Sequence, residues 1–165
     1  MAGHLSGKNI AVTGAGNGIG RAVAILCAEE GANVVVADYG VELDGSAPSS
    51  AVADEVVNQI KELGGNAIAV AGDVSESEVG QRIVETAIEA WGRIDGVACA
   101  AGILRERMLF NMTDEEFDDV VRVHLRGHFN VYRAASAVMR KQEGGGSILG
   151  FTSGAFVAST AQPNY

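Results

Sequence analysis

Cysteine, proline and aromatic residues are scarce in this 165-residue sequence, which has two cysteines, two prolines and 5% aromatic side chains. Cys27 and Cys99 both stand in apolar surroundings, one in an expected helix and one in an expected strand. We therefore expect two buried free thiols rather than a disulfide or a metal site. Because 47% of the residues are apolar and only 20% are charged, the composition is typical of a globular protein and excludes a disordered one.

Positive charge and long apolar runs are scarce as well. The chain has 12 Lys and Arg against 21 Asp and Glu, for a formal net charge of −9. Nucleic acids and anionic membranes call for basic patches, so this balance argues against both as main partners. No apolar run has the length of a membrane span and the N-terminus carries no targeting pattern, so we expect a cytoplasmic protein. The length predicts a single domain, 1–165.

Glycine, in contrast, is grouped where an expected strand meets an expected helix. Residues 10–12 predict a buried strand of a parallel sheet, and residues 21–28 predict a helix. The segment between them consists of Thr13, Gly14, Ala15, Gly16, Asn17, Gly18, Ile19 and Gly20. Its glycines allow a tight turn and the close approach of a pyrophosphate, which would face the N–H groups at the positive end of the helix. We interpret the segment as a dinucleotide phosphate cradle, with a glycine-rich turn that binds nothing as the alternative.

The spacing of these glycines distinguishes two versions of such a cradle. The common pattern G-x-G-x-x-G fails, because Ile19 stands where a third glycine should follow Gly14 and Gly16. The sequence instead fits T-G-x-x-x-G-I-G, which is more specific than a lone G-x-G-x-x-G.

Two acidic residues are expected at the carboxyl edge of the sheet, where open α/β folds bind their ligands. Residues 34–37 predict a second buried strand ending at Asp38, whose carboxylate can accept hydrogen bonds from the adenosine ribose hydroxyls. Asp38 would also repel a 2′-phosphate, so it favours NAD over NADP; the alternative is an exposed loop acid. A third strand, 66–71, ends near Asp73 and Val74. Asp73 either holds the adenine amino group or serves as a turn or helix-capping acid.

The remaining segments continue to alternate between helix and strand. Further helices are expected over 51–63, 76–91 and 113–141, and further strands over 96–101 and 147–152. Thr113 and Glu116 form a capping box that opens the longest helix. The polar loop 39–50 is long for its place, so we expect it to be mobile or to lie near the adenine. The small residues Ala100, Ala101 and Gly102 would let a cofactor approach the sheet closely.

This alternation predicts the fold class. Strands joined by helical crossovers form right-handed βαβ units, with helices on both faces of one parallel sheet. We therefore expect an α/β fold with a Rossmann-type, doubly wound parallel sheet. Five strands are visible, and we expect the C-terminal strands of the six-strand dinucleotide fold to be absent from this chain.

Several motifs together resemble the short-chain dehydrogenase/reductase family. They are TGAGNGIG at 13–20, Asp38, Asp73-Val74, ACAAG at 98–102, Ser153 and Asn164-Tyr165. ACAAG departs from the usual N-N-A-G but keeps the final alanine and glycine. The segments GILRER at 102–107 and VHLRG at 123–127 are similar to the dehydrogenase module of peroxisomal multifunctional enzymes, which act on 3-hydroxyacyl-CoA. Bacterial oxidoreductases of unknown substrate share this pattern.

The resemblance implies NAD-dependent hydride transfer between nicotinamide and a secondary alcohol or ketone. Tyr165 matches the tyrosine that exchanges a proton with the substrate oxygen, and Ser153 matches the serine that orients this oxygen. The Ser153–Tyr165 spacing is 12, whereas the family more often shows 13, the spacing of Thr152; either hydroxyl remains a candidate. The alternative is that neither residue is catalytic, in which case Ser153 is a turn residue and Tyr165 is a half-buried aromatic residue.

Two further expectations follow from the same resemblance. His124 stands where many members have an asparagine that supports a proton relay; a relay role and a core histidine both remain open. The family's lysine, four residues after the tyrosine, would lie beyond this chain.

Family members commonly form homodimers or homotetramers. The alternative to a dehydrogenase is an NAD-binding module without catalysis.

Overall fold

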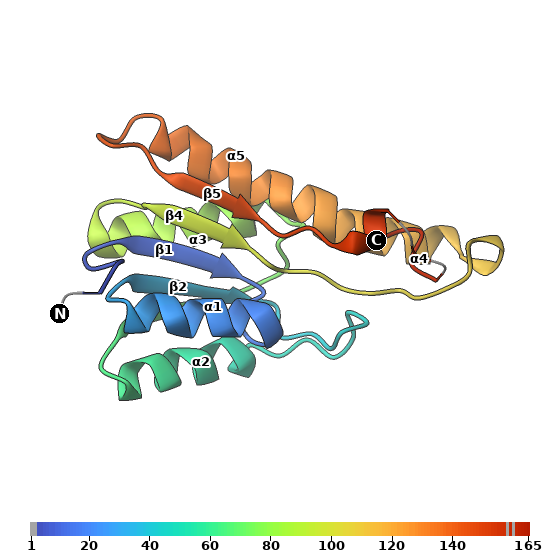
Figure 1. Ribbon diagram of the computed structural model, residues 1–165, viewed down its shortest axis with the longest axis horizontal. Helices are drawn as coiled ribbons and strands as arrows, with labels where there is room; N and C mark the ends of the chain where they lie inside the picture. The colour runs from blue at the N-terminus through green and yellow to red at the C-terminus, as the bar shows by residue number, and fades with distance from the viewer. Residues whose placement is uncertain (1–2, 158, 160) are drawn as a thin grey trace.

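Five parallel strands form the central sheet, in the order β3-β2-β1-β4-β5 (Figure 1). The computed structural model describes residues 3–157, 159 and 161–165. The strands are β1 (Asn9–Thr13), β2 (Asn33–Asp38), β3 (Asn66–Ala71), β4 (Gly96–Cys99) and β5 (Ser147–Gly150). The strand order reverses between β1 and β4, so the predicted Rossmann-type α/β fold is confirmed.

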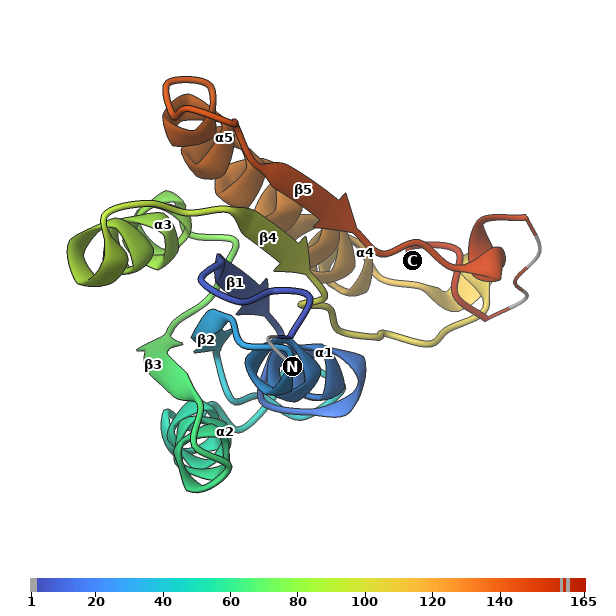
Figure 2. The ribbon, with the colours of Figure 1, turned by 60° about the vertical axis from the view of Figure 1, so that its left-hand side comes forward.

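Helices cover both faces of this sheet (Figure 2). They are α1 (Gly18–Glu29), α2 (Ala51–Glu62), α3 (Ser77–Trp91), α4 (Asp114–Val121) and α5 (Gly127–Met139). α1 and α2 pack on one face, and α3 and α5 pack on the other. None of the described helices is long and apolar enough to cross a membrane.

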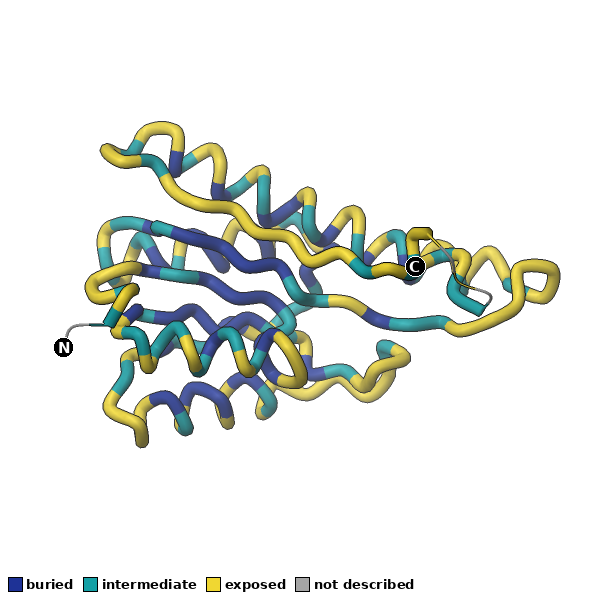
Figure 3. The backbone as a smooth tube through the Cα atoms, in the orientation of Figure 1, coloured by how far each residue is buried: buried dark blue, intermediate teal, exposed yellow. Residues whose placement is uncertain are grey.

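The strands in the middle of the sheet are buried on both faces because their side chains alternate between two cores. Val12, Val34 and Val36 face α1 and α2. Ala11, Val35 and Ala37 face α3 and α5. β5 differs, because within the part of the chain that the structure describes it pairs with β4 alone, and all four of its residues are exposed (Figure 3).

The longest predicted helix is confirmed at its start and corrected in its middle. The Thr113 hydroxyl accepts the Glu116 N–H, and the Glu116 carboxylate accepts the Thr113 N–H, so the capping box is present. A π-helical turn over Arg122–Arg126 then separates α4 from α5. One extra residue in this turn shifts the phase of the helix, which a 3.6-residue periodicity does not predict.

Some smaller predictions were wrong. β4 ends at Cys99 and β5 at Gly150, each two residues before the predicted end, because only these residues pair with a neighbouring strand. The helical spacing of apolar residues over 51–63 and 76–91 predicts Leu63 and Ala90 on the apolar helix faces, but both are exposed. Leu63 follows the last turn of α2, and the half-buried Trp91 packs on the core beside Ala90. Cys99 is buried as predicted, but Cys27 is only half-buried.

The amino end of the sheet is held by a ladder of asparagines. Asn9, Asn33 and Asn66 are the first residues of three adjacent strands and lie in register. The Asn66 side chain donates to Asn33 (3.0 Å) and Asn33 donates to Asn9 (2.7 Å). A register slip would break both hydrogen bonds, so the ladder fixes the alignment from which the opposite, carboxyl end is built.

Candidate functional site

The glycine turn after β1 begins the site. Gly14 and Gly18 have φ of 64° and 53°, conformations that glycine adopts at no steric cost. A Cβ on Gly14 would lie 2.7 Å from the Ala101 Cα, so this glycine allows the turn to touch the end of β4. The side chain of the N-cap residue Asn17 makes no capping hydrogen bond, and no acidic residue lies in the first turn of α1. The N–H groups of that turn are therefore placed to receive an anion.

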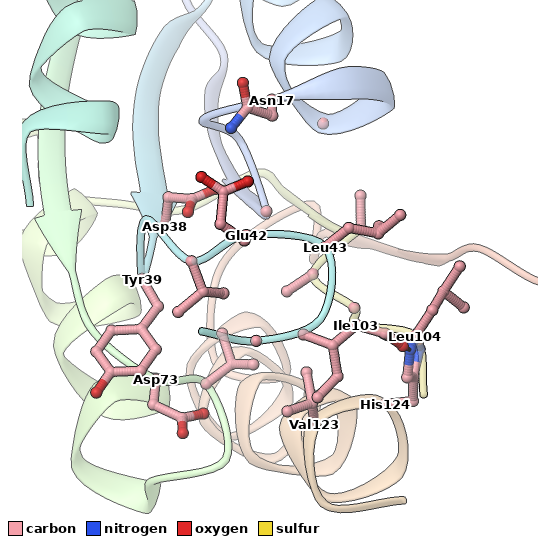
Figure 4. Close-up of a pocket in the computed structure, with 18 of the residues that line it drawn as sticks. Asn17, Asp38, Tyr39, Glu42, Leu43, Asp73, Ile103, Leu104, Val123 and His124 are labelled. Carbon is pink, nitrogen blue, oxygen red and sulfur yellow. Dashed lines mark hydrogen bonds between the residues drawn. The ribbon is translucent and has the colours of Figure 1, made fainter. Parts of the chain in front are cut away.

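A cavity of about 700 Å³ opens beside this turn, over the carboxyl edge of the sheet (Figure 4). Most of the residues proposed to bind a cofactor line it: Gly14, Asn17, Gly18, Ile19, Gly20, Asp38, Asp73, Val74, Ala100, Ala101 and Gly102. The walls also include residues that sequence reasoning did not assign to a cofactor site, among them Val41, Leu43, Leu104, Arg105, Asp119 and Arg122. The predicted cradle and the carboxyl ends of β2, β3 and β4 thus meet in one hollow.

Thr13 and Gly16 do not line the cavity and instead support its walls. The Thr13 hydroxyl accepts the Ala101 N–H (3.2 Å), and the Thr13 carbonyl accepts the Ala100 N–H (3.2 Å). A Cβ on Gly16 would lie 2.9 Å from the Asp38 carboxylate, so only glycine fits this contact. Thr13 therefore fixes the backbone after β4, and Gly16 lies against Asp38, so both residues support the cavity wall from behind.

Asp38 ends β2 with its carboxylate fixed in the cavity wall. Gly16 N–H donates to Oδ2 (2.7 Å), and Gly40 N–H donates to Oδ1 (2.6 Å). Each oxygen keeps a lone pair that can accept a further hydrogen bond. The arrangement therefore fits the adenosine ribose of a dinucleotide, with its diphosphate at the start of α1.

Asp73 is already engaged within the protein. Its Oδ1 accepts the Ser75 N–H (2.8 Å), and its Oδ2 accepts from Arg122 Nη1 (2.7 Å). Burial alone would raise the pKa of Asp73, but these hydrogen bonds, from Ser75 and then Arg122, overcome it and hold that pKa below its usual value. These are the contacts of a turn acid, and an adenine amino group would have to share the same oxygens.

The loop over residues 39–50 forms one side of the cavity. The Leu104 N–H donates to the Leu43 carbonyl (2.9 Å), so the loop reaches from the end of β2 to the segment after β4. Within the loop, Gly40 and Ser49 are joined by a backbone hydrogen bond of 3.0 Å. The loop therefore borders the space beside Asp38 where an adenosine would lie.

A second cavity of about 410 Å³ adjoins the first and shares His124 and Tyr165 with it. Ser153 and Thr152 both line this second cavity, so the choice of hydroxyl remains open. The other lining residues are the apolar Val121, Leu125, Phe151 and Phe156 and the polar His128 and Asn164. His124 and Tyr165 thus lie between the two cavities, and the two candidate hydroxyls line the second one.

His124 lies in the π-helical turn and faces Tyr165. The two rings meet edge to face, with centroids 4.9 Å apart and an interplanar angle of 77°. Nε2 of His124 lies 3.1 Å from the Ile103 nitrogen and 2.9 Å from the Ile103 oxygen. Burial lowers the pKa of His124 and outweighs the hydrogen bond to Ile103, which raises it, so the ring is neutral at pH 7.

Two arginines beside the site are paired with acids on α4. Arg105 binds Asp119 (3.1 Å), and Arg107 binds Glu116 (2.6 Å). The hydrogen bond from Arg107 is the main reason why the pKa of Glu116 falls to about 2. An anionic substrate group would have to compete with these carboxylates for either arginine.

Known proteins share this framework. A family model described as short chain dehydrogenase matches residues 8–165. Mouse peroxisomal multifunctional enzyme type 2 is 43% identical over 162 residues, covering 98% of this chain and 22% of that protein. A hydroxyacyl-CoA dehydrogenase of Mycobacterium tuberculosis is 46% identical over 149 residues, covering 88% and 45%. The crystal structure of a short chain dehydrogenase from Mycobacterium avium matches with a TM-score of 0.89 and 43% identity, covering 99% of this chain and 60% of that one.

The chain therefore spans between 22% and 60% of the length of these relatives. The matched region includes the glycine turn, Asp38, His124 and Tyr165. The resemblance inferred from the sequence motifs is confirmed over nearly the whole chain. The chain belongs to the short chain dehydrogenase family.

Proposed function

We propose that this chain forms the cofactor half and the catalytic centre of an NAD-dependent dehydrogenase. The observation that carries the proposal is the continuity of the first cavity, which runs from the glycine turn and Asp38 to His124 and Tyr165. A dinucleotide bound with its diphosphate at α1 and its ribose at Asp38 would extend along this cavity. Its nicotinamide, when bound, accepts or supplies a hydride.

The residues at the junction of the two cavities fit the proton transfer that accompanies this hydride. The Tyr165 hydroxyl would exchange a proton with the substrate oxygen, while the Ser153 or Thr152 hydroxyl holds that oxygen by a hydrogen bond. His124 is neutral and in edge contact with Tyr165, while its Nε2 is held by the Ile103 backbone. A π-helical turn at this position fits a functional role, since such turns recur at functional sites.

We propose NAD rather than NADP because Asp38 occupies the ribose end of the cavity. A carboxylate there accepts hydrogen bonds from two ribose hydroxyls but repels a 2′-phosphate. No positive side chain approaches Asp38 within hydrogen-bond distance among the described residues.

For the substrate we propose a secondary alcohol or its ketone, with a 3-hydroxyacyl thioester as the specific candidate. Two supports are the apolar walls of the second cavity, which suit an acyl chain, and the hydroxyacyl-CoA dehydrogenase among the relatives. A homodimer or homotetramer is proposed as the assembly. Exposed apolar residues of α4 and α5, Phe117 and Phe129, would then be covered.

The test is turnover of 3-hydroxyacyl-CoA with NAD by the full-length protein and by its Tyr165→Phe variant. Removing one hydroxyl should lower kcat by roughly a thousandfold, because a positioned proton donor contributes about 10²–10⁴. NADH binding, followed by fluorescence, should stay within about twofold. Tyr39→Phe is the matched control, since Tyr39 lines the same cavity near Asp38. Full activity in Tyr165→Phe would remove this residue from the mechanism, and NADH binding without any turnover would favour a non-catalytic NAD-binding module.

A further inference from the structure

The tyrosine segment, residues 161–165, is bound to the chain that follows β4. The Arg107 N–H donates to the Ala161 carbonyl (2.8 Å). At the other end of the segment, the Tyr165 N–H donates to the Gln162 carbonyl (3.2 Å), which closes a turn. Tyr165 therefore stands at the end of a short turn whose first residue is fixed to a distant part of the chain.

The side chain of Asn164, the residue before Tyr165, holds this turn from a second direction. Its Nδ2 donates to the Arg105 carbonyl (3.1 Å) and to the Glu116 carbonyl (2.9 Å). Arg105 follows β4, and Glu116 lies in the first turn of α4, beside which the chain ends (Figure 1). One amide group thus joins the tyrosine segment to two other elements.

The two carbonyls that accept from Asn164 belong to parts of the chain that are themselves tied together. Arg105 binds Asp119 on α4 (3.1 Å), and Arg107 binds Glu116 (2.6 Å). The capping box at Thr113 fixes the first turn of the same helix. The acceptors therefore keep their places, and the position of the Asn164 amide is determined by them.

The ring of Tyr165 contacts the same run of helix further along the chain. α4 continues directly into the π-helical turn that carries His124, whose ring meets the Tyr165 ring edge to face at 4.9 Å. Asn164 bonds to the helix at Glu116, and Tyr165 touches it at His124. These two contacts together limit where the Tyr165 hydroxyl can lie.

We propose that Asn164 is a positioning residue that places the Tyr165 hydroxyl through its hydrogen bonds to the Arg105 and Glu116 carbonyls. This inference rests on the proposed function, because Asn164 would act on the reaction through Tyr165. The two hydrogen bonds that carry it do not depend on that function.

The chemistry of the asparagine side chain fits this role. Two carbonyl oxygens require two N–H donors on one group, and a carboxamide nitrogen carries two. An aspartate of the same size carries none when ionised, and a serine hydroxyl carries one. Asn164→Asp therefore removes both hydrogen bonds with little change in volume, whereas Asn164→Gln keeps both donors on a longer side chain.

The first experiment measures hydrogen exchange of the Arg107 and Tyr165 backbone amides in the full-length protein. We expect Asn164→Asp to accelerate exchange at both amides about tenfold, because the tyrosine segment loses two hydrogen bonds to its neighbours. Gln162→Ala is the matched control, since it removes a side-chain hydrogen bond to Glu106 from the same segment; exchange there should stay within about twofold. Unchanged exchange in Asn164→Asp would overturn the proposal.

The second experiment measures turnover of 3-hydroxyacyl-CoA with NAD. Asn164→Asp should lower kcat roughly thirtyfold with KM for NAD within about twofold, since a misplacement of about 1 Å can cost about a hundredfold in rate. Asn164→Gln should recover part of kcat, and Gln162→Ala should stay within about twofold of the wild type. A loss confined to KM for NAD would assign Asn164 to cofactor binding and overturn the proposal. If the wild type turned over no substrate, the proposed function would fail, while hydrogen exchange would still decide whether Asn164 holds the tyrosine segment.

The third experiment separates positioning from a general structural defect. The kcat of the double variant Asn164→Asp/Tyr165→Phe is compared with that of Tyr165→Phe alone. We expect the two values to agree within about twofold, because Asn164 has no further effect once the hydroxyl that it places is gone. A structural defect would lower kcat in both backgrounds, so multiplied losses in the double variant would contradict the proposal.

Discussion

The two ends of the same sheet use their polar groups in opposite ways. At the amino end, Asp95 accepts hydrogen bonds from the Asn9 N–H (3.0 Å) and Arg93 Nε (3.0 Å), and the asparagine ladder extends across β1, β2 and β3. At the carboxyl end, α1 begins without a side-chain cap, and the cavity opens over Gly14 and Asp38. Polar groups at one end are satisfied within the chain, whereas several at the other can still bind a ligand.

This difference explains why the amino end of the sheet stabilises the fold and the carboxyl end can bind a ligand. Paired side chains at strand starts fix the register, and register in turn places every residue at the strand ends. A cavity with free N–H groups and open carboxylate lone pairs contributes less to folding but can recognise an anion and a ribose. Substitutions at the two ends should therefore separate stability from cofactor binding.

The largest expected effect is on binding, at Gly14. Gly14→Ala places a Cβ 2.7 Å from the Ala101 Cα in a backbone with φ of 64°, so the turn must move. We expect NADH affinity to fall by roughly a hundredfold, because the diphosphate site is deformed. Titration of NADH fluorescence measures the loss.

Gly64→Ala is the matched control for that substitution. Gly64 has φ of 82°, and an added Cβ would meet nothing within 4 Å. It carries a similar backbone penalty of about 1 kcal/mol but lies away from the cavity. Equal loss of NADH affinity in both variants would mean that Gly14 acts through general backbone strain and not through the site.

The next effect is on stability, at the centre of the ladder. Asn33→Ala leaves the side-chain oxygen of the buried Asn9 without its donor. We expect the free energy of unfolding to fall by about 1–3 kcal/mol, the cost of an unsatisfied buried polar group, with NADH affinity unchanged. Urea denaturation measures the first quantity. Asn66→Ala, at the exposed end of the ladder, should cost less than Asn33→Ala; the reverse order would contradict the ladder.

The smallest effect is on pH dependence. The pKa of His124 is lowered in the folded protein from its ordinary 6.5, because burial disfavours the charged ring. The unfolded chain therefore binds a proton first as the pH falls, and the stability linked to His124 is present above pH 6.5 and is lost below it, down to the folded pKa. Unfolding free energies between pH 7.5 and about pH 5 should decline less in His124→Asn than in the wild type. Equal slopes would show that His124 is not buried as described.

The sequence predicts the residues at the carboxyl end of the sheet, where the cavity lies, better than the asparagine ladder at the amino end. The glycine spacing and the position of Asp38 directly after an apolar run depend on local pattern, and both lie in the cavity wall. The ladder instead depends on which strands pair and in which register, so three separate asparagines carry no local signal. Within the site, the π-helical turn is not predicted either, because its extra residue shifts the phase of the helix and a 3.6-residue periodicity carries no signal for that shift.

Long-range pairing also limits what could be predicted for the charged residues. The sequence alone indicates either an adenine contact or a turn acid at Asp73, because its partner Arg122 stands 49 positions further along the chain. Arg105 likewise pairs with Asp119 on α4, a partner that its place in the sequence does not indicate. A spacing in the sequence gives the residue types but not the ion pairs that the fold creates.

The most direct test of the account is the ratio of NADH to NADPH affinity in the wild type and in Asp38→Ala. Asp38 is held at the cavity wall by Gly16 and Gly40, where its charge would repel a 2′-phosphate. We expect the wild type to bind NADH at least about a hundredfold more tightly, and Asp38→Ala to reduce this ratio to within about tenfold, since each tenfold corresponds to about 1.4 kcal/mol. An unchanged ratio in Asp38→Ala would contradict the assignment of the carboxyl end of β2 as the ribose site.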